Sequence, residues 1–424
     1  MNKFISILIA LTITLLFPAS GQDLKFARKT LDNLCSPEFH GRGYTNKGDS
    51  IAASYINKQL KKFRLKSFSN GYIQDYFISA NTFPEKIIVS LNKSEELIPG
   101  YDYLITASSG SLEGTFPVIV MNHKLLDHPE KLKKINRDTI IKSFILIDTL
   151  HLKNKGFKDA YNDIINYNIL GAKGIIQLEY KDLIYRPSTI EQTFPVVKIS
   201  RGVLPDSLKT ITVKIKNKYE KEYHTRNVVG FVEGELDSFI VFSAHYDHLG
   251  EMGEGVIFPG ANDNGSGTTM VLNLAKHFSR KKNKPKYSIA FMFFSAEEMG
   301  LLGSTYYVNN PLFPLDKIKF LINLDMVGSG EKGIKIVNGT EYKTCFEKLV
   351  KINKENQYLH DVYIRGPAAN SDHYPFYNKG VNSIFMYTLG EYAEYHNIFD
   401  KAESLPLNEY EDLFRLLLDF VKTF

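Results

Sequence analysis

Histidines and carboxylates recur along the second half of this 424-residue chain in an order that could hold two metal ions. Imidazole nitrogens and carboxylate oxygens are common ligands of catalytic zinc, and sites with two ions a few ångströms apart carry out hydrolysis. Each residue alone has an ordinary structural interpretation, such as a strand-end histidine or a turn aspartate, but five in this order favour a metal centre. The candidate metal ligands are His245, Asp263, Glu298, Asp325 and His396.

Two further carboxylates accompany these ligands. Asp247 lies two residues after His245, and side chains two apart on a strand point to the same side, so its carboxylate could hydrogen-bond the other ring nitrogen of a metal-bound histidine. Glu297 directly precedes Glu298. Hydrolysis of an amide by a metal-activated water needs a carboxylate that accepts the proton and passes it to the leaving amine. One glutamate can therefore be a ligand while its neighbour is the general base.

Apolar strands that alternate with amphipathic helices would position these residues. Residues 239–244, 287–294 and 318–324 are predicted strands, and their near-continuous apolar character is typical of a sheet covered on both faces. Residues 266–279 and 410–422 are predicted helices. We therefore expect an α/β fold, a three-layer α/β/α sandwich with a central mixed, mostly parallel sheet. The candidate ligands fall at or just beyond carboxyl ends of strands, where such sheets place their sites.

The segment between residues 91 and 223 differs in character and predicts a small inserted α/β domain. A helical run at 157–170 lies among short β-like runs. Residues 22–90 would then be the N-terminal part of the larger domain, and 224–424 its catalytic part. The β-like runs are 118–120, 144–147, 174–176 and 196–199.

Residues 1–21 predict a secretory signal peptide. Lys3 precedes an apolar stretch from Phe4 to Pro18, and the small residues 19–21 come just before Gln22. The apolar stretch is shorter than the roughly 20 residues of a spanning helix. We therefore expect a protein that is secreted or exported to the periplasm, with no stable membrane anchor.

Charge and cysteine content bear on the partners of the protein and on its disulfides. Lysine and arginine number 52 against 47 aspartate and glutamate, and the basic residues are scattered or in short runs, so we expect no nucleic-acid partner. Cys35 and Cys345 are the only cysteines. They fit one disulfide or two free thiols equally well, and neither has a metal-type spacing.

The motifs together resemble the secreted di-zinc aminopeptidase family, the co-catalytic zinc metallopeptidases that also include glutamate carboxypeptidase and glutaminyl cyclase. The resemblance covers most of the chain after the signal peptide, including the loop 36–43. The stretches that carry it follow one another as 245–247, 260–267, 296–304, 323–328, 371–373 and 395–396.

This resemblance implies a zinc-dependent exopeptidase with two zinc ions per chain. One ion would be held by His245 and Asp325, and the other by Glu298 and His396. Asp263 would bridge the two ions.

The resemblance also implies that Glu297 is the general base and that Asp247 is the partner of His245. It implies a cis peptide bond between residues 263 and 264. The chain departs from the family after His396, where a threonine and an Asp-Thr pair are usual, but Asp400 keeps the carboxylate.

Residues 91–223 resemble a protease-associated domain, which we expect to shape substrate access rather than to take part in the chemistry. The other histidines near the motifs, His40 and His248, have structural interpretations. Candidate pocket residues are Asp372, His373, Tyr395 and Arg365.

Peptides are the expected substrates, and an aminopeptidase that releases N-terminal residues is the favoured activity. A carboxypeptidase or dipeptidase on the same scaffold is the alternative, in which Arg365 could bind a substrate carboxylate. Glutaminyl cyclases of the family use one zinc and lack the first histidine, so His245 and Asp247 argue against that transferase. A non-catalytic module would be expected to have lost ligands, and all five are present.

Overall fold

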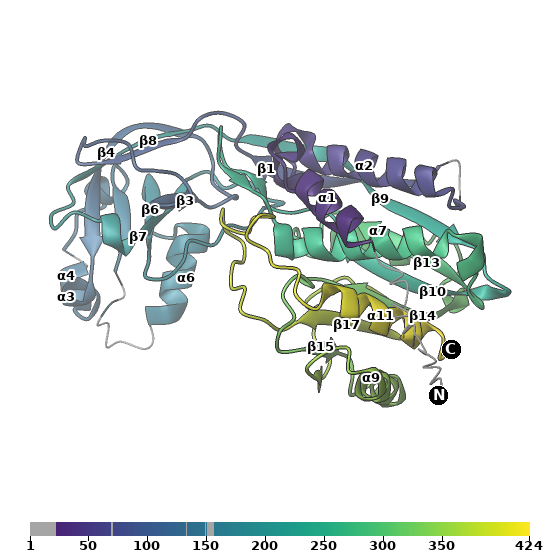
Figure 1. Cartoon of the computed structure of the whole chain (residues 1–424). Helices are drawn as coiled ribbons and strands as arrows, with labels where there is room; N and C mark the ends of the chain where they lie inside the picture. The colour runs from purple at the N-terminus through teal and green to yellow at the C-terminus, as the bar shows by residue number, and fades with distance from the viewer. Residues whose placement is uncertain (1–22, 69–70, 133, 149, 151–156) are drawn as a thin grey trace, which may run out of the picture.

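Two β-sheets, each with its own helices, organise the chain. The computed structural model describes residues 23–424 apart from 69–70, 133, 149 and 151–156. An eight-stranded sheet and a seven-stranded sheet lie toward opposite ends of the molecule (Figure 1). The predicted signal peptide lies outside the described residues. Within the described residues, no helix combines the length and apolar character needed to cross a membrane.

The larger sheet is mixed, with a parallel centre, as the sequence predicts. Strand β10 lies parallel to β13 on one side and to β14 on the other, and β14 is parallel to β17. The pairs β1–β9, β9–β13 and β15–β17 are antiparallel. In spatial order the strands are β1 (Ile73–Thr82), β9 (Lys218–Val232), β13 (Tyr287–Phe294), β10 (Leu236–His245), β14 (Ile318–Leu324), β17 (Ser383–Thr388), β15 (Ile334–Val337) and β16 (Val362–Ile364).

Helices cover both faces of this sheet and complete the three layers. Alternate residues of β10 pack on opposite sides: Ile240 and Phe242 join the core with five helices, whereas Val241 joins a second core with two others. The predicted α/β/α sandwich is therefore confirmed. The first face carries α1 (Leu24–Leu34), α2 (Gly48–Phe63), α7 (Gly267–Phe278), α9 (Lys343–Asn356) and α11 (Tyr410–Val421), and the second carries α8 (Leu302–Asn309) and α10 (His373–Asn378).

The smaller sheet is built from residues between Ile88 and Ile215. Residues 218–223, which we assigned to the insertion, instead begin strand β9 of the larger sheet, and β2 starts before residue 91. The identity of this region as a protease-associated domain remains a prediction. Its strands in spatial order are β2 (Ile88–Leu91), β8 (Thr210–Ile215), β4 (Leu112–Met121), β5 (Phe144–Ile147), β6 (Gly174–Glu179), β7 (Val196–Ser200) and β3 (Tyr103–Ile105), and its helices are α3 (His123–Leu126), α4 (Pro129–Leu132), α5 (Arg137–Ile140) and α6 (Phe157–Tyr167).

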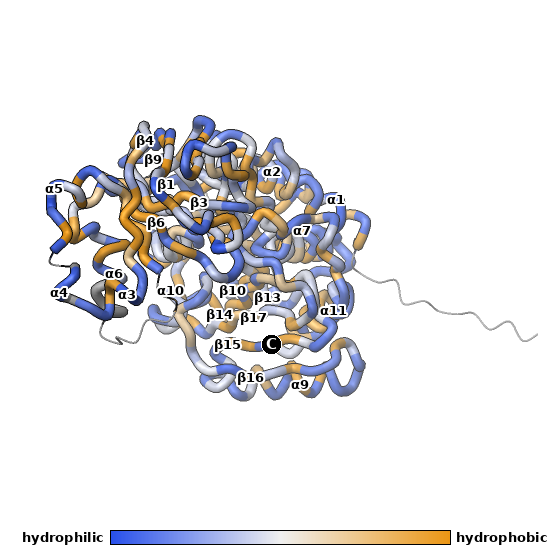
Figure 2. The backbone as a smooth tube through the Cα atoms, turned by 90° about the vertical axis from the view of Figure 1, so that its left-hand side faces the viewer, coloured by the Kyte–Doolittle hydropathy of each residue, from blue (hydrophilic) through white to orange (hydrophobic). Residues whose placement is uncertain are grey.

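The two sheets share apolar packing. Leu249, Met252, Val256 and Phe258, which follow β10, join the core beneath the smaller sheet. Figure 2 shows hydrophobic segments running through this sheet, β6 among them. The smaller sheet is therefore attached through a buried apolar contact close to the end of β10.

Both cysteines are free thiols within the described part of the chain. Burial raises the pKa of Cys35 to about 12, so this thiol stays protonated at neutral pH. The structure thus favours the second of the two interpretations that the sequence left open.

Candidate metal centre

The carboxyl ends of three neighbouring parallel strands bring together residues far apart in sequence. Strand β10 ends at His245, and β14 ends one residue before Asp325. The loop after β13 carries Glu297 and Glu298. Because β13, β10 and β14 are parallel and adjacent, these ends meet at one edge of the sheet.

Asp263 reaches the same edge on a turn that precedes α7. The turn follows a short hairpin of β11 (Gly250–Glu251) and β12 (Ile257–Phe258), and the Asp263–Asn264 peptide bond is cis, which confirms the expectation. The buried carboxylate of Asp400 accepts hydrogen bonds from the main-chain N–H groups of Asn262, at 2.8 and 3.1 Å, and of Asp263, at 3.1 Å. Asp400, the carboxylate that this chain retains after His396, therefore holds the turn in place.

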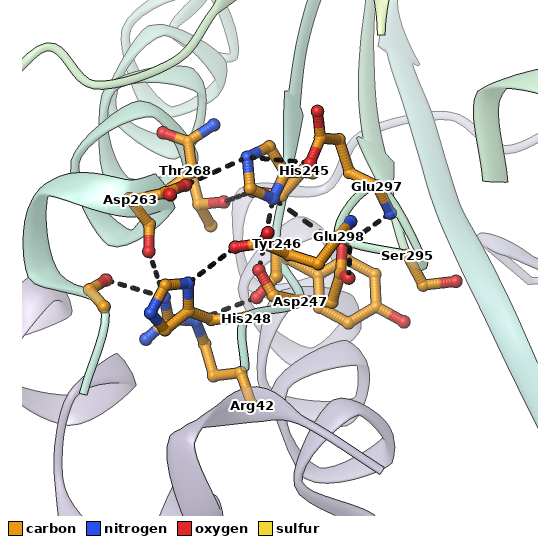
Figure 3. Close-up of polar contacts among 12 residues, drawn as sticks. Arg42, His245, Tyr246, Asp247, His248, Asp263, Thr268, Ser295, Glu297 and Glu298 are labelled. Atoms are coloured by element: carbon orange, nitrogen blue, oxygen red, sulfur yellow. Dashed lines mark hydrogen bonds and ion pairs between the residues drawn. The ribbon is translucent and has the colours of Figure 1, made fainter. Parts of the chain in front are cut away.

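Arg42 fastens the turn from the other side. Its guanidinium is fully buried and donates to the main-chain oxygens of Tyr246, Pro259 and Gly260 at 2.8, 2.6 and 2.6 Å. Arg42 lies in a short 3-10 segment, Pro37–Arg42, and so connects the chain's first loop with the end of β10 (Figure 3). The loop was part of the family resemblance, but the role of Arg42 was not predicted from the sequence.

The first cluster of candidate ligands centres on His245. Its Nε2 lies 3.4 Å from Asp263 Oδ1, 3.4 Å from Asp325 Oδ1 and 3.9 Å from Glu297 Oε2. Its Nδ1 is nearer to the main-chain oxygen of Asp247, at 3.1 Å, than to the Asp247 carboxylate, at 3.6 Å. Both oxygens thus belong to Asp247, and the role of its carboxylate as the partner of His245 stays a prediction.

The Asp247 carboxylate also binds the loop that carries Glu297 and Glu298. It accepts hydrogen bonds from Tyr44 Oη at 2.9 Å and from the main-chain N–H groups of Glu297 at 3.1 Å and Glu298 at 3.4 Å. A carboxylate that binds two consecutive N–H groups fixes the loop that carries both glutamates.

The second cluster is formed around Glu298 and shares Asp263 with the first. His396 Nε2 lies 3.0 Å from Asp263 Oδ2 and 3.1 Å from Glu298 Oε2. His248 Nδ1 lies 2.8 Å from the other oxygen, Glu298 Oε1 (Figure 3). Asp263 thus presents one oxygen to each cluster.

The spacing of the first cluster suits a shared zinc ion. Nε2 of His245 and Oδ1 of Asp325 are both buried and have no hydrogen-bond partner within the described part of the chain, although they lie 3.4 Å apart. Two ligands about 2.1 Å from a tetrahedral zinc ion are themselves roughly 3.4 Å apart. The mixed nitrogen and oxygen donor set also fits zinc.

Buried negative charge is concentrated here. Burial raises the pKa of Glu297 well above its usual value against the opposing charge of His245, and burial also raises the pKa of Asp325. Burial raises the pKa of Asp372 to about 7. Burial would lower the pKa of His396, but Glu298 and the hydrogen bond to Asp263 raise it to about 10. Carboxylates crowded in this way are stabilised by divalent cations.

A pocket of about 250 Å³ opens onto both clusters. Tyr395, which we predicted as a pocket residue, lines it and stacks on His396 with ring centroids 3.9 Å apart. No lysine or arginine is among the described residues that line it. The lining residues are Asp263, Glu297, Glu298, Asp325, Met326, Asn370, Phe385, Tyr387, Tyr395 and His396.

Three predicted pocket residues lie elsewhere. Asp372 and His373 are fully buried behind the pocket, because α10 starts at His373 and packs its apolar side against the sheet. Arg365 is exposed and donates to Oη of the pocket residue Tyr387 at 3.2 Å. The aromatic wall of Phe385 and Tyr387 comes from β17 and was missed, because an apolar strand end carries no chemical signal of its own.

A segment of the smaller sheet's region contacts the second cluster. The main-chain N–H of Tyr185 donates to the main-chain oxygen of His396 at 3.0 Å. The buried ring of Tyr185 stacks on Phe258 with centroids 4.7 Å apart and planes 8° apart. Residue 185 therefore touches both the candidate ligand His396 and the strand that leads into the Asp263 turn.

The chain resembles known peptidases in sequence. The chain is 29% identical to aminopeptidase YwaD of Bacillus subtilis (strain 168) over 272 residues, which cover 60% of this chain and 57% of that protein. It is 30% identical to leupeptin-inactivating enzyme 1 of Streptomyces exfoliatus over 167 residues, 38% of this chain and 35% of that protein. The chain thus spans little more than half the length of the first of these relatives and about a third of the second.

The likeness in structure is more extensive. A solved zinc aminopeptidase from Bacillus subtilis superposes with a TM-score of 0.67 and 21% identity, covering 93% of this chain and 94% of that one. At this identity the likeness establishes the fold.

The fold and the paired clusters define an α/β protein with a candidate two-ion metal centre at the carboxyl edge of its sheet. Residues 227–421 match the model of peptidase family M28, so the catalytic part of the chain is similar to that family.

Proposed function

We propose that this protein is a zinc-dependent aminopeptidase that binds two zinc ions and releases N-terminal residues from peptides. The observation that carries the proposal is the pair of clusters joined by Asp263, one with His245 and Asp325, the other with Glu298 and His396. When bound, the two ions supply Lewis-acid activation of water and of the scissile carbonyl group.

Glu297 is the proposed proton carrier. Its side chain is 14% exposed, lines the pocket and lies 3.9 Å from His245 Nε2, beside the first cluster rather than within its closest contacts. Burial raises its pKa, which brings a glutamate closer to the operating pH of a general base. The hydrogen bond from its main-chain N–H to Asp247 fixes the direction from which the carboxylate enters the pocket.

The pocket chemistry supports an aminopeptidase over a carboxypeptidase. Four carboxylates line it, and among the described lining residues there is no lysine or arginine to receive a substrate carboxylate. The carboxypeptidase or dipeptidase alternative rests on Arg365, which reaches the pocket through its hydrogen bond to Tyr387.

The remaining parts of the proposal concern export and access. The N-terminal sequence supports a signal peptide and a secreted or periplasmic protein. The contact of Tyr185 with His396 supports a role of the smaller sheet's region, proposed as protease-associated, in bounding the entrance to the pocket.

Assays on matched peptides test the proposed activity. The purified protein is expected to release the first residue from peptides with a free N-terminus and to leave their N-acetylated counterparts intact. Release of C-terminal residues from the N-acetylated peptides would establish the carboxypeptidase alternative instead.

Metal analysis tests the proposed cofactor. We expect two equivalents of zinc per chain at saturation, because five ligand-type side chains exceed what one tetrahedral site with an open position uses. Chelation should abolish peptide hydrolysis and lower the midpoint of thermal unfolding, since bound ions stabilise the folded state. Saturation at one equivalent, with His245 uninvolved, would contradict the two-ion arrangement.

A further inference from the structure

His248 lies at the second cluster although it is not one of the predicted metal ligands. It follows Asp247 directly, its side chain is fully buried, and its ring lies 5.9 Å from that of His396 in an edge-on arrangement. Its Nδ1 is 2.8 Å from Glu298 Oε1. We assigned His248 a structural role from the sequence, and this contact gives the residue a direct relation to a proposed ligand.

The two oxygens of Glu298 have different surroundings. Oε1 meets His248, whereas Oε2 lies 3.1 Å from His396 Nε2 on the side of Asp263. A carboxylate that binds a cation is ionised and can only accept hydrogen bonds, so the hydrogen bond at Oε1 requires the proton on His248 Nδ1. One Glu298 oxygen is thereby engaged, and the other is directed toward the second cluster.

The backbone is shaped to hold the imidazole in this place. Gly260 lies against the ring, and a Cβ atom there would overlap Cδ2 and Cγ of His248. Gly260 also has a φ of 61°, a left-handed conformation that favours glycine. The main-chain N–H of His248 donates to the oxygen of Arg42 at 3.3 Å. The ring is thus fixed by the same turn that carries Asp263.

We propose that His248 is a positioning residue for the second metal ion: its Nδ1–H holds Glu298 Oε1, so that Glu298 binds the ion through Oε2 alone. The proposal rests on the two-ion centre of the proposed function. Partners of this kind orient a ligand and reduce the freedom it loses when the ion binds.

Three substitutions separate this role from others. Leucine at position 248 removes the donor, whereas asparagine places an amide N–H near the position of Nδ1 and glutamine places one nearer to Nε2. We expect His248→Leu to weaken the second zinc equivalent by ~10–100-fold, the usual cost of losing such a partner, while the first equivalent is unchanged. His248→Asn should restore most of the affinity, and His248→Gln should restore less.

The measurement is zinc affinity by competition with a chromophoric chelator, on the full-length purified protein, with folding checked by near-ultraviolet circular dichroism. His40→Leu is the matched control, because His40 Nδ1 makes the same contact with a glutamate, 2.9 Å from Glu251 Oε1, away from the clusters. That control should bind both equivalents as the unsubstituted protein does.

Two results would overturn the proposal. One is unchanged affinity for the second equivalent in folded His248→Leu. The other is an equal loss in the Leu and Asn variants together with one fewer imidazole around zinc by X-ray absorption, which would make His248 itself a ligand. If the unsubstituted protein binds two equivalents but hydrolyses no peptide, the proposed activity fails and the positioning role can still be measured.

Discussion

Glu297→Gln is expected to keep both zinc equivalents and to lose turnover by at least the ~10²–10⁴-fold that general acid–base catalysis contributes. Glutamine keeps the size of the side chain and much of its hydrogen bonding but has no basicity. Its position beside the first cluster, 3.9 Å from His245 Nε2, leaves the closer ligand contacts intact. Steady-state kinetics on a peptide with a free N-terminus, with metal analysis of the same preparation, measures both quantities.

Glu298→Gln is the matched control, because it makes the same chemical change one residue later. We expect it to weaken the second zinc equivalent, since a neutral amide is a poorer ligand than a carboxylate. If Glu297→Gln retains near-normal turnover, or loses metal as Glu298→Gln does, the base is another group, and the buried carboxylate of Asp372 becomes the next candidate.

Asp263→Ala should weaken the binding of both zinc equivalents. The loss of affinity should exceed the ~10–100-fold that removal of a ligand's hydrogen-bond partner costs. Its two carboxylate oxygens face different clusters, Oδ1 toward His245 and Oδ2 toward His396, so that one substitution removes an oxygen from each. Peptide hydrolysis should fall to background. Zinc titration of the purified variant measures the effect.

Asp325→Ala provides the comparison for Asp263, because Asp325 belongs to the first cluster alone. We expect that variant to retain the second equivalent. A protein that loses only one equivalent on Asp263→Ala would show that the residue does not bridge the two positions.

The core strands were predictable because their sequences are almost continuously apolar. The predicted bounds of residues 287–294 and 318–324 match β13 and β14, and the helix expected at 410–422 ends one residue earlier, at Val421. Burial on both faces leaves few polar residues in such strands, and the polar residues resume where the strands end. Part of the clusters could therefore be located from the sequence, since Glu298 and Asp325 follow those ends, whereas Asp263 and His396 lie in other loops.

The supporting contacts were not predictable, because they join segments without a shared pattern. Arg42 binds main-chain oxygens, and any residue type at the acceptor position would present the same group. The predicted boundary at residue 223 falls inside strand β9, which begins at Lys218 and belongs to the larger sheet. The first residues of β9 are mostly polar, so nothing in the sequence marked them as part of a core strand. His248 could have been predicted, because it directly follows the His-Tyr-Asp motif, but we interpreted it as a structural histidine.

The hydrogen bond from the main-chain N–H of Tyr185 to the main-chain oxygen of His396 links the smaller sheet's region to the candidate metal centre of the larger domain. Domains within one chain commonly move relative to each other unless the interface between them is large and hydrophobic. Here a rotation of the smaller sheet's region would either break this hydrogen bond or displace His396, and the stacking of Tyr185 on Phe258 would pass the same displacement toward the Asp263 turn. The region is consequently a poor candidate for exchange with an unrelated domain, because the residues around Tyr185 would have to be grafted together with it.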